Sequence, residues 1–439
     1  MGPEWITLIM FGSLVLLLML GVRIAWVLGS VMVIATLVFW NPAGLRTLVT
    51  NTFGAMQSIF FVAIPLFVFM GIILERSGMA DDLFEMFYAW SGRIRGGLAI
   101  GSVLICAIFA AMTGLIGASC VTMGLIATPA MLKRGYSKDM ALGSVIAPAT
   151  LGILIPPSVI MIILALLGKM SVGKLFFAGM VPGLLMACLF IVYIIINGLI
   201  FPNSTPASPI QASWKQRIIL LRSVILPMIV IISVLGSIFL GIATPTESAA
   251  VGAGALLIIA GARKKLNQKV LTEAATETFK ITGLNLWILI NALAFSAVYT
   301  ALGGTAFVKL VITGLNLPPL GIVGIIIVLL LIMGLFIDPQ AIIFIVAPLA
   351  FPIVKELGFD PIWFGVIFVL CVCTAHVTPP FGFSLFYMKS IAPEGVTLGD
   401  IYHSVRWFLL CMIGTLALVV FFPQIALWFP TMMIVPAGG

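Results

Sequence analysis

The sequence predicts an all-α integral membrane protein with two inverted-topology repeats, about ten spanning helices, two re-entrant helical hairpins and two broken helices. Three observations carry this prediction. Of the 439 residues, 62% are hydrophobic and only 8% are charged, against about 25% charged residues in a soluble domain. Apolar runs near the roughly 20-residue length of a membrane span recur along the chain. A set of Pro, Gly and aromatic residues also recurs at a constant offset in the second half.

The charged residues exclude a soluble protein and argue against nucleic acid as a partner. The 22 Lys and Arg and the 14 Asp and Glu residues are too few to cover a soluble surface. A net charge of +8 would suggest nucleic-acid binding in a soluble chain, but in a membrane protein it reflects basic residues retained on the cytoplasmic side. We therefore expect the lipid bilayer as the surroundings and no nucleic-acid partner.

Ten uninterrupted apolar runs are predicted to cross the membrane. They cover residues 5–20, 24–40, 58–74, 140–167, 175–200, 223–240, 249–262, 281–302, 361–388 and 405–429. Glu4 and no basic cluster precede the first run, so we expect it to be retained as a span rather than cleaved as a signal peptide.

Two further apolar runs, residues 98–132 and 320–354, are interrupted by Thr113-Gly114 and by Asp338-Pro339-Gln340. Each run is one kinked span or a re-entrant hairpin. Basic residues flank the first run on both sides: Arg93, Arg95, Lys133, Arg134 and Lys138. A hairpin keeps both clusters in the cytoplasm, whereas a single span would leave one outside. With hairpins at about 97–132 and 320–355, seventeen basic residues lie inside and five outside, and both termini lie outside.

An internal repeat relates the two halves of the chain. Five residues recur 223 positions later: Pro129, Gly135, Tyr136, Pro156 and Pro157 return as Pro352, Gly358, Phe359, Pro379 and Pro380. Each half then holds three spans, a hairpin and two spans, and this odd number of crossings inverts the second half in the membrane. We predict a first repeat over residues 1–200, a cytoplasmic linker rich in Pro and Ser over 201–221, and a second repeat over 222–439.

A Pro-Pro pair follows each hairpin and is predicted to break a helix at membrane depth. Pro156-Pro157 lies within the helix predicted at about 139–167, and Pro379-Pro380 within that at about 361–389. Each pair removes two backbone donors and forces the preceding residue out of the helical region. The freed carbonyls persist in a dry interior only where a cation, water or substrate binds them. A simple proline kink is the alternative, and the symmetric pairing of two breaks with two hairpin tips argues against it.

Few polar side chains are available at these depths. The first tip, TGLIGAS (113–119), offers two hydroxyls and two glycines, whose bare backbone lets carbonyls approach a hard cation such as Na⁺; close helix packing is the alternative. Asp338 is the only carboxylate predicted in the middle of an apolar segment, which indicates ion coordination or proton coupling. His376, beside the second break, either titrates and contacts ligands or packs as a neutral side chain. Glu247 is expected to cap the helix that follows it.

No motif supports catalysis or direct use of ATP. The sequence lacks a GxxxxGK[ST] phosphate loop, an HExxH motif and a GxSxG motif, so we assign no catalytic residue and no cofactor. Inverted repeats with re-entrant hairpins and broken helices are typical of secondary transporters, which bind substrate and ions near the midplane. No Lys or Arg is predicted in either tip or break, so an anionic substrate would be bound by helix N-termini, hydroxyls and bound cations.

The chain also resembles the large membrane subunit of TRAP (tripartite ATP-independent periplasmic) transporters over nearly its whole length. The resemblance is carried by FAAMTGLIGAS (109–119), TPAMLKRGYSKDMALGS (128–144), LGILIPPS (151–158), GIATPTESAAVG (241–252), the Asp338 segment, and LGFDPIWFGV (357–366) followed by TPPFG (378–382). It implies a bacterial inner-membrane, Na⁺-coupled importer that works by an elevator motion. It also implies two partners, a small four-helix membrane subunit and a periplasmic substrate-binding protein.

The resemblance further assigns residues to sites. The implied Na⁺ ligands are Thr113, Gly117, Ser119, Gly152, Ile155 and Pro157 in the first half, and Asp338, Thr378 and Pro380 in the second. We expect the substrate to contact Ser119, Ser158, His376 and Gly382. The family usually has Asn at the position of Cys371 and an apolar residue at that of His376, and these departures indicate an altered pocket.

The sequence thus predicts Na⁺-driven import of a small organic anion, most simply a carboxylate, with no metal other than Na⁺. The alternative is a stand-alone Na⁺- or H⁺-coupled symporter or exchanger of a related inverted-repeat family that needs no binding protein. A channel is disfavoured, because hairpins that enter from both sides would plug the midplane.

Overall fold

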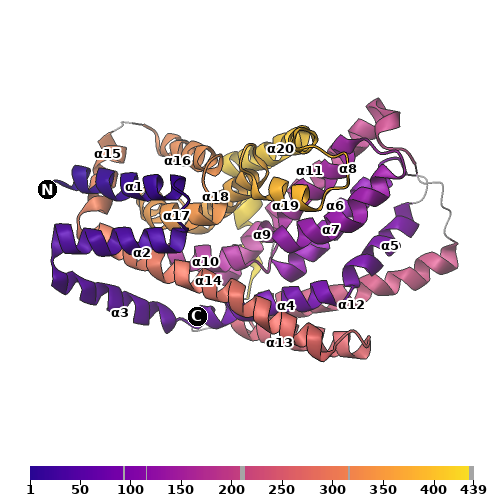
Figure 1. The fold of residues 1–439 in the computed structure, drawn as a ribbon, viewed down its shortest axis with the longest axis horizontal. Helices are drawn as coiled ribbons and strands as arrows, with labels where there is room; N and C mark the ends of the chain where they lie inside the picture. The colour runs from indigo at the N-terminus through magenta and orange to yellow at the C-terminus, as the bar shows by residue number, and fades with distance from the viewer. Residues whose placement is uncertain (92–93, 115, 208–212, 315–316, 435–439) are drawn as a thin grey trace.

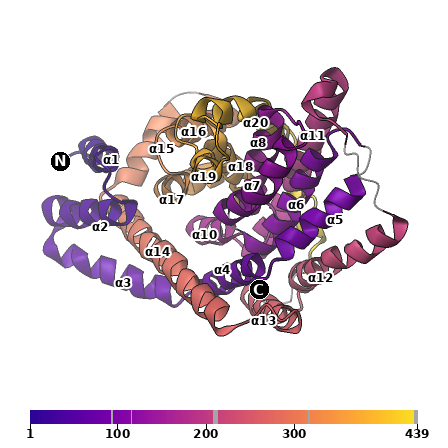
Figure 2. The same cartoon turned by 45° about the vertical axis from the view of Figure 1, so that its right-hand side comes forward.

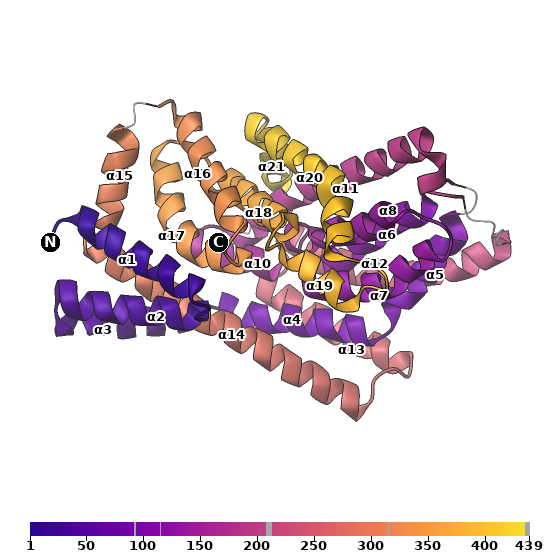
Figure 3. The same cartoon turned by 45° about the horizontal axis from the view of Figure 1, so that its top comes forward.

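The structure is a computed structural model that describes residues 1–439 except 92–93, 115, 208–212, 315–316 and 435–439. Every element in this described part is helical (Figure 1), which confirms the predicted all-α class. Arg93, Leu115 of the first hairpin tip and residues 208–212 of the predicted linker lie outside the described residues. The helices form two layers, which can be followed in the turned views of Figures 2 and 3.

We call the first layer the α14 layer after its longest helix. It contains α1 (Pro3–Met19), α2 (Ile24–Ala35) with a π-helical turn (Thr36–Trp40), α3 (Leu45–Met56), α4 (Phe60–Arg76), α12 (Trp214–Phe239), α13 (Pro245–Ala262) and α14 (Gln268–Ala301). Helix α14 is 34 residues long and packs against α2, α3 and α4, while α13 packs against α4. Near the start of α14, Arg76 pairs with Glu273 (3.3 Å) and Glu277 (2.9 Å).

We call the second layer the hairpin layer. Its first part contains α6 (Gly97–Thr113), α7 (Ile116–Leu132), α8 (Lys138–Ala149), α9 (Leu151–Leu154), α10 (Val159–Gly168) and α11 (Val172–Ile200). Its second part contains α16 (Pro319–Gly334), α17 (Pro339–Glu356), α18 (Pro361–Val377), α19 (Phe383–Ile391), α20 (Leu398–Phe421) and α21 (Gln424–Leu427). Large side chains such as Trp363, Phe364 and Phe368 fill its core and are fully buried.

Two short helices connect the layers, and each is tied to the hairpin that follows it. Helix α5 (Met79–Ser91) packs against α6 and α12, and α15 (Gly304–Gly314) packs against α1 and α14. Arg134, just beyond α7, donates to the Tyr88 hydroxyl of α5 (2.7 Å). Lys309 of α15 donates to Glu356 at the end of α17 (2.9 Å). The two contacts therefore occupy corresponding places in the two halves.

Helix boundaries recur at the 223-residue offset found in the sequence. Shifted by this offset, α6, α7 and α8 would begin at residues 320, 339 and 361, and α16, α17 and α18 begin at Pro319, Pro339 and Pro361. The pair α3 and α4 corresponds to α14, which is continuous where the first half has a non-helical stretch between Met56 and Phe60. Helix α12 begins at Trp214, inside the segment that the sequence predicts as a linker.

The described residues contain five helices that are long and apolar enough to cross a membrane: α11, α13, α14, α17 and α20. Lys138–Leu154 and α10 add a sixth if their 43° bend is counted within one span. Shorter apolar helices of 10–17 residues, among them α1, α6, α7, α16 and α18, accompany them. This composition is that of a multi-pass membrane protein, and the number of ten spans stays a prediction.

Polar caps determine where several helices begin. Glu247 N donates to Thr244 Oγ1 (3.3 Å) and Thr244 N donates to Glu247 Oε2 (2.7 Å), which forms a reciprocal capping box at the start of α13. The expected capping role of Glu247 is thereby confirmed. Asp338 and Asp360 cap α17 and α18, and each is followed by a proline at the first helical position.

Candidate functional site

The tip of the first hairpin lies directly against the break in the following helix. Gly114, between α6 and α7, has φ +62°, and a Cβ added there would lie 2.7 Å from the carbonyl oxygen of Pro157. Only glycine combines this backbone conformation with so close an approach. Thr113 and Ser119 of the same tip are 1% and 0% exposed, and Thr113 Oγ1 donates to the Phe109 carbonyl (2.9 Å).

The first break is buried, and the hydroxyl of Ser158 at this break bonds to the half-helices on both sides of it. Ile155 leaves the helical conformation with ψ 122°, as expected for a residue before proline. Ser158 caps α10: its hydroxyl accepts from Met161 N (3.3 Å) and donates to the Ile153 carbonyl (2.9 Å). Helix α9, which carries Gly152, packs against both helices of the first hairpin. The predicted residues of the first half are therefore brought together.

The second hairpin places Asp338 at the start of α17. Asp338 Oδ1 accepts from Gln340 N (2.9 Å), and the carboxylate is half-buried. No Lys or Arg in the described residues pairs with it. The end of α16 comes close to the last turn of α18, because a Cβ added at Gly334 would collide with Ala375. Asp338 thus lies at a tip that packs beside the second break.

The second break has the same backbone course as the first but is more open. Thr378 leaves the helix with ψ 123°, and its hydroxyl donates to the Thr374 carbonyl (2.7 Å). Gly382 N donates to the Thr378 carbonyl (3.1 Å), and the Tyr402 hydroxyl donates to the Pro380 carbonyl (2.9 Å). The described residues include no hydrogen bond from Asp338 to Thr378 or Pro380. Asp338, one of the three predicted Na⁺ ligands of this half, therefore lies near the break without bonding to it.

His376 is buried on the last turn of α18 and is held by its own helix. Its Nδ1 lies 2.8 Å from the Val372 carbonyl, so Nδ1 carries the proton that this contact needs. Its ring centroid is 6.5 Å from that of Phe383 on α19. A Cβ added at Gly382 would lie 2.7 Å from the His376 carbonyl oxygen. This environment favours the packing interpretation of His376, and leaves one ring nitrogen for a ligand.

The two broken helices meet at corresponding positions. Cys373 Sγ of α18 donates to the carbonyl of Thr150, between α8 and α9, at 3.5 Å. These two residues are 223 positions apart, the same offset that relates the two Pro-Pro pairs. Both Pro-Pro peptide bonds are cis. This contact therefore joins two residues that correspond at the 223-residue offset.

Two residues of α19, Tyr387 and Ser384, lie at the site and were not predicted from the sequence. A Cβ added at Gly117 would lie 3.3 Å from Tyr387 Cζ and 3.6 Å from its hydroxyl, so the tyrosine ring lies against the first tip. Ser384 is 0% exposed, and its hydroxyl has no partner among the described residues. In FSLFYM (383–388), the first six residues of the half-helix that follows the second break, these are the only polar side chains, and that signal could have identified them.

The two breaks differ in exposure although they correspond by position. Ser158 is 0% exposed, whereas Phe381, its counterpart 223 residues later, is 51% exposed. Helix α10 packs against α11, α17 and α18 of its own layer and also against α4 of the α14 layer, while α19 packs against α7, α8, α18 and α20 of its own layer. The site is therefore closed around the first break and open around the second.

Comparison with known protein families gives a match over most of the chain. The sequence model described as "Tripartite ATP-independent periplasmic transporter, DctM component" matches residues 11–425. The C4-dicarboxylate TRAP transporter large permease protein DctM of Pseudomonas aeruginosa is 35% identical over 400 residues, which cover 90% of this chain and 92% of that protein.

The names of further relatives mention other substrates. The ectoine/5-hydroxyectoine TRAP transporter large permease protein UehC of Ruegeria pomeroyi is 32% identical, with 95% of this chain and 97% of that protein covered. The sialic acid TRAP transporter permease protein SiaT of Haemophilus influenzae is 29% identical, with 95% and 67% covered. Among solved structures, the YdaH transporter of Alcanivorax borkumensis has the same fold, with a TM-score of 0.65, 16% identity, and 98% of this chain and 100% of that chain covered.

Proposed function

Because the chain belongs to the family of the DctM component of tripartite ATP-independent periplasmic transporters, we propose that it is the permease of a Na⁺-coupled importer of a small organic anion, most simply a carboxylate. The contact between Gly114 and the Pro157 carbonyl carries this proposal. It puts a small-residue hairpin tip against a helix break, where backbone oxygens are available to ions and substrate.

Na⁺ is the coupling ion in this proposal, and the donor chemistry of the site supports it. The first-half ligands would be Thr113, Gly117, Ser119, Gly152, Ile155 and Pro157, and the second-half ligands Asp338, Thr378 and Pro380. These residues offer hydroxyl, carbonyl and carboxylate oxygens, which suit a hard cation. The absence of a basic partner for Asp338 among the described residues leaves its charge available to a cation.

The substrate anion would lie between the tips and the breaks, in contact with Ser119, Ser158, His376 and Gly382. No Lys or Arg occurs in either tip or break, so the negative charge would be met by the N-termini of α7, α10 and α19 together with bound Na⁺. Tyr387 adds a hydroxyl against the first tip. Binding of ions and substrate is then coupled, because the cation supplies charge that the side chains lack.

An elevator motion is part of this proposal, with the hairpin layer as the transport domain and the α14 layer as the scaffold. The connecting helices α5 and α15, each tied to its own hairpin, support this division. The 223-residue offset in helix boundaries supports two repeats, which we propose to be inverted in the membrane. We place the protein in a bacterial inner membrane, with a small four-helix subunit and a periplasmic substrate-binding protein as partners.

Proteoliposomes that contain this chain, its small subunit and the binding protein would test the proposal. Radiolabelled succinate, as a C4-dicarboxylate, ectoine and sialic acid are the first substrates to test, after the names of the relatives. We expect saturable uptake that stops when choline replaces Na⁺ outside. The reason is that inward movement of each Na⁺ supplies about 2.3 kcal/mol per 100 mV of membrane potential to drive uptake. Uptake that is unaffected by removal of the Na⁺ gradient would contradict the coupling.

The same vesicles without the binding protein provide the second arm of the experiment. A permease that depends on its partner takes up no substrate in this arm. Equal uptake in both arms would favour a stand-alone symporter or exchanger instead.

A further inference from the structure

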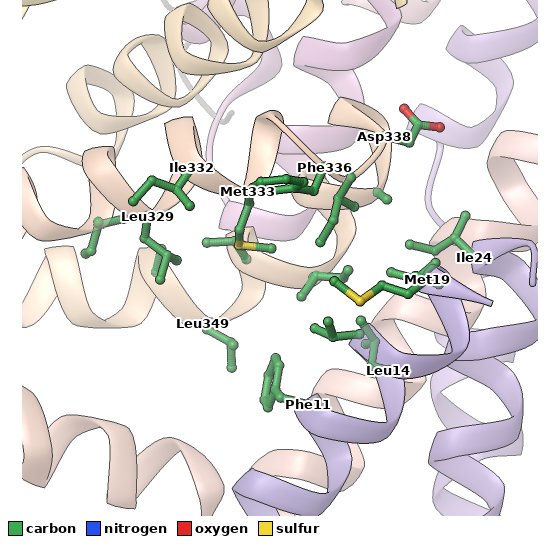
Figure 4. Close-up of a pocket in the computed structure, with 18 of the residues that line it drawn as sticks. Phe11, Leu14, Met19, Ile24, Leu329, Ile332, Met333, Phe336, Asp338 and Leu349 are labelled. Atoms are coloured by element: carbon green, nitrogen blue, oxygen red, sulfur yellow. The ribbon is translucent and has the colours of Figure 1, made fainter. Parts of the chain in front are cut away.

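A groove that borders the proposed ion site at Asp338 runs between α1 and the second hairpin. It encloses about 710 Å³ and is lined by side chains of α1, the α1–α2 turn, α15, α16 and α17. Figure 4 shows Phe11, Leu14 and Met19 of α1 opposite Leu329 and Ile332 of α16. Only two lining residues, Arg23 and Asp338, are charged. In the same view the Asp338 carboxylate points away from the apolar side chains, so the interior of this α1 groove is hydrocarbon-like.

Arg23 supplies a positive charge at one end of the α1 groove. It is the exposed residue before the first turn of α2. In the described part of the chain its guanidinium has no carboxylate partner. Trp26, one turn further along, is 63% exposed, and exposed Trp beside a basic residue is typical of the headgroup level of a bilayer. The topology predicted from the sequence puts this end on the cytoplasmic side.

The length of the α1 groove corresponds to one leaflet. Its lining residues on α1 extend from Phe11 to Met19, a rise of about 12 Å at 1.5 Å per residue. Half of the roughly 30 Å hydrocarbon core is about 15 Å. The groove is therefore long enough for the acyl chain of a lipid in one leaflet.

We propose that the α1 groove is a binding site for a phospholipid, with one acyl chain between α1 and the α16–α17 hairpin and the phosphate on Arg23. The charge at Arg23 complements the phosphate, and the apolar lining complements the chain. The lipid fills the space that separates α1 from α16 and α17. This lipid is a component of the permease and is not the substrate of the proposed transport reaction.

The test uses the full chain in nanodiscs that contain phosphatidylethanolamine with a photoreactive diazirine in the middle of one acyl chain. After irradiation, mass spectrometry locates the label. We expect labelled peptides from α1 and α16. Arg23→Gln should lower this labelling about fivefold, the effect of one Arg near a charged headgroup, while Arg46→Gln, an exposed basic residue on α3 outside the groove, should leave it unchanged.

A second pair of variants tests the apolar part of the α1 groove. Leu329→Trp fills the groove from α16 and should also reduce labelling of α1, whereas Val328→Trp should not. The two residues are neighbours on one helix and are 47% and 54% exposed, but only Leu329 lines the groove. Labelling that is equally strong in Arg23→Gln, Leu329→Trp and both controls would overturn the proposal. The readout needs no transport, so it stands apart from the test of the proposed function.

Discussion

Asp338 and Asp360 have the same local structure in different surroundings. Each precedes a proline and caps a helix by accepting from the backbone N–H two residues on, from Gln340 at 2.9 Å and from Ile362 at 2.7 Å. Asp360 is exposed, whereas Asp338 is half-buried and has no basic partner in the described residues. A charge at the centre of a membrane helix costs about 2.5–3.5 kcal/mol. The capping role alone does not offset that cost.

Asp338→Asn therefore separates the charge of this residue from its capping role. Asn caps helices as well as Asp does, so we expect the variant to insert and to unfold at the same temperature as the natural protein or a higher one. Na⁺-dependent uptake should be lost. Asp360→Asn is the matched control and should keep both uptake and stability. Normal Na⁺ dependence of Asp338→Asn would refute a role of its charge in coupling.

At the scale of elements, the first hairpin and the first broken helix are joined through backbone rather than side chains. Gly114 and Gly358 both have positive φ, at +62° and +81°. A Cβ at Gly114 would meet the Pro157 carbonyl, whereas one at Gly358 would meet nothing within 4 Å. Substitution of these two glycines therefore separates the cost of backbone strain from the cost of losing the contact between the hairpin tip and the helix break.

Gly358→Ala should lose only the strain of a left-handed alanine, about 1–2 kcal/mol of unfolding free energy. Gly114→Ala should lose this and about 1–3 kcal/mol more, because the tip must move away from the break. Thermal unfolding in detergent and uptake in proteoliposomes measure the two effects. We expect uptake to fall at least tenfold in Gly114→Ala and to persist in Gly358→Ala. Equal effects of the two substitutions would show that the contact with Pro157 has no function.

Much of the element order was predictable because glycine, proline and aspartate mark where helices stop and start. The interruptions at Thr113-Gly114 and Asp338-Pro339 and the two Pro-Pro pairs are places where helices end. The connecting helices α5 and α15 and the first part of α14 were not predicted, since their mixed polar composition gives no apolar run. Tyr387 was also missed, because its place beside Gly117 depends on the packing of α19 on α7. The Na⁺ and substrate residues remain predictions.

At the scale of the whole molecule, the two halves share helix boundaries but differ in packing. The first break is closed, and helix α10 that follows it packs against α4; the second break is open, and helix α19 that follows it packs within its own layer. Under the proposed elevator motion, we expect the two repeats to exchange these packings between two states.

Cysteine labelling can detect this difference. In a Cys188→Ser background, which removes the exposed native thiol, Phe381→Cys should react with a membrane-impermeant maleimide and Ser158→Cys should not. With Na⁺ and substrate present, an elevator predicts that Ser158→Cys becomes reactive from the opposite face of the vesicles. Reactivity of both positions from the same face, in all conditions, would contradict the exchange of roles.

The length of α14 has a consequence for depth in the membrane. Its apolar part, from Ile281 onward, rises about 31 Å at 1.5 Å per residue, which matches the roughly 30 Å hydrocarbon core. The preceding polar part, from Gln268 to Lys280, adds about 20 Å beyond it and holds the glutamates that pair with Arg76. Sliding the helix by one turn toward the opposite face would draw Lys280 toward the hydrocarbon core, at whose centre a Lys costs about 2.5–3.5 kcal/mol. Helix α14 is thus anchored at one depth, and any displacement along the membrane normal has to be made by the helices that it supports.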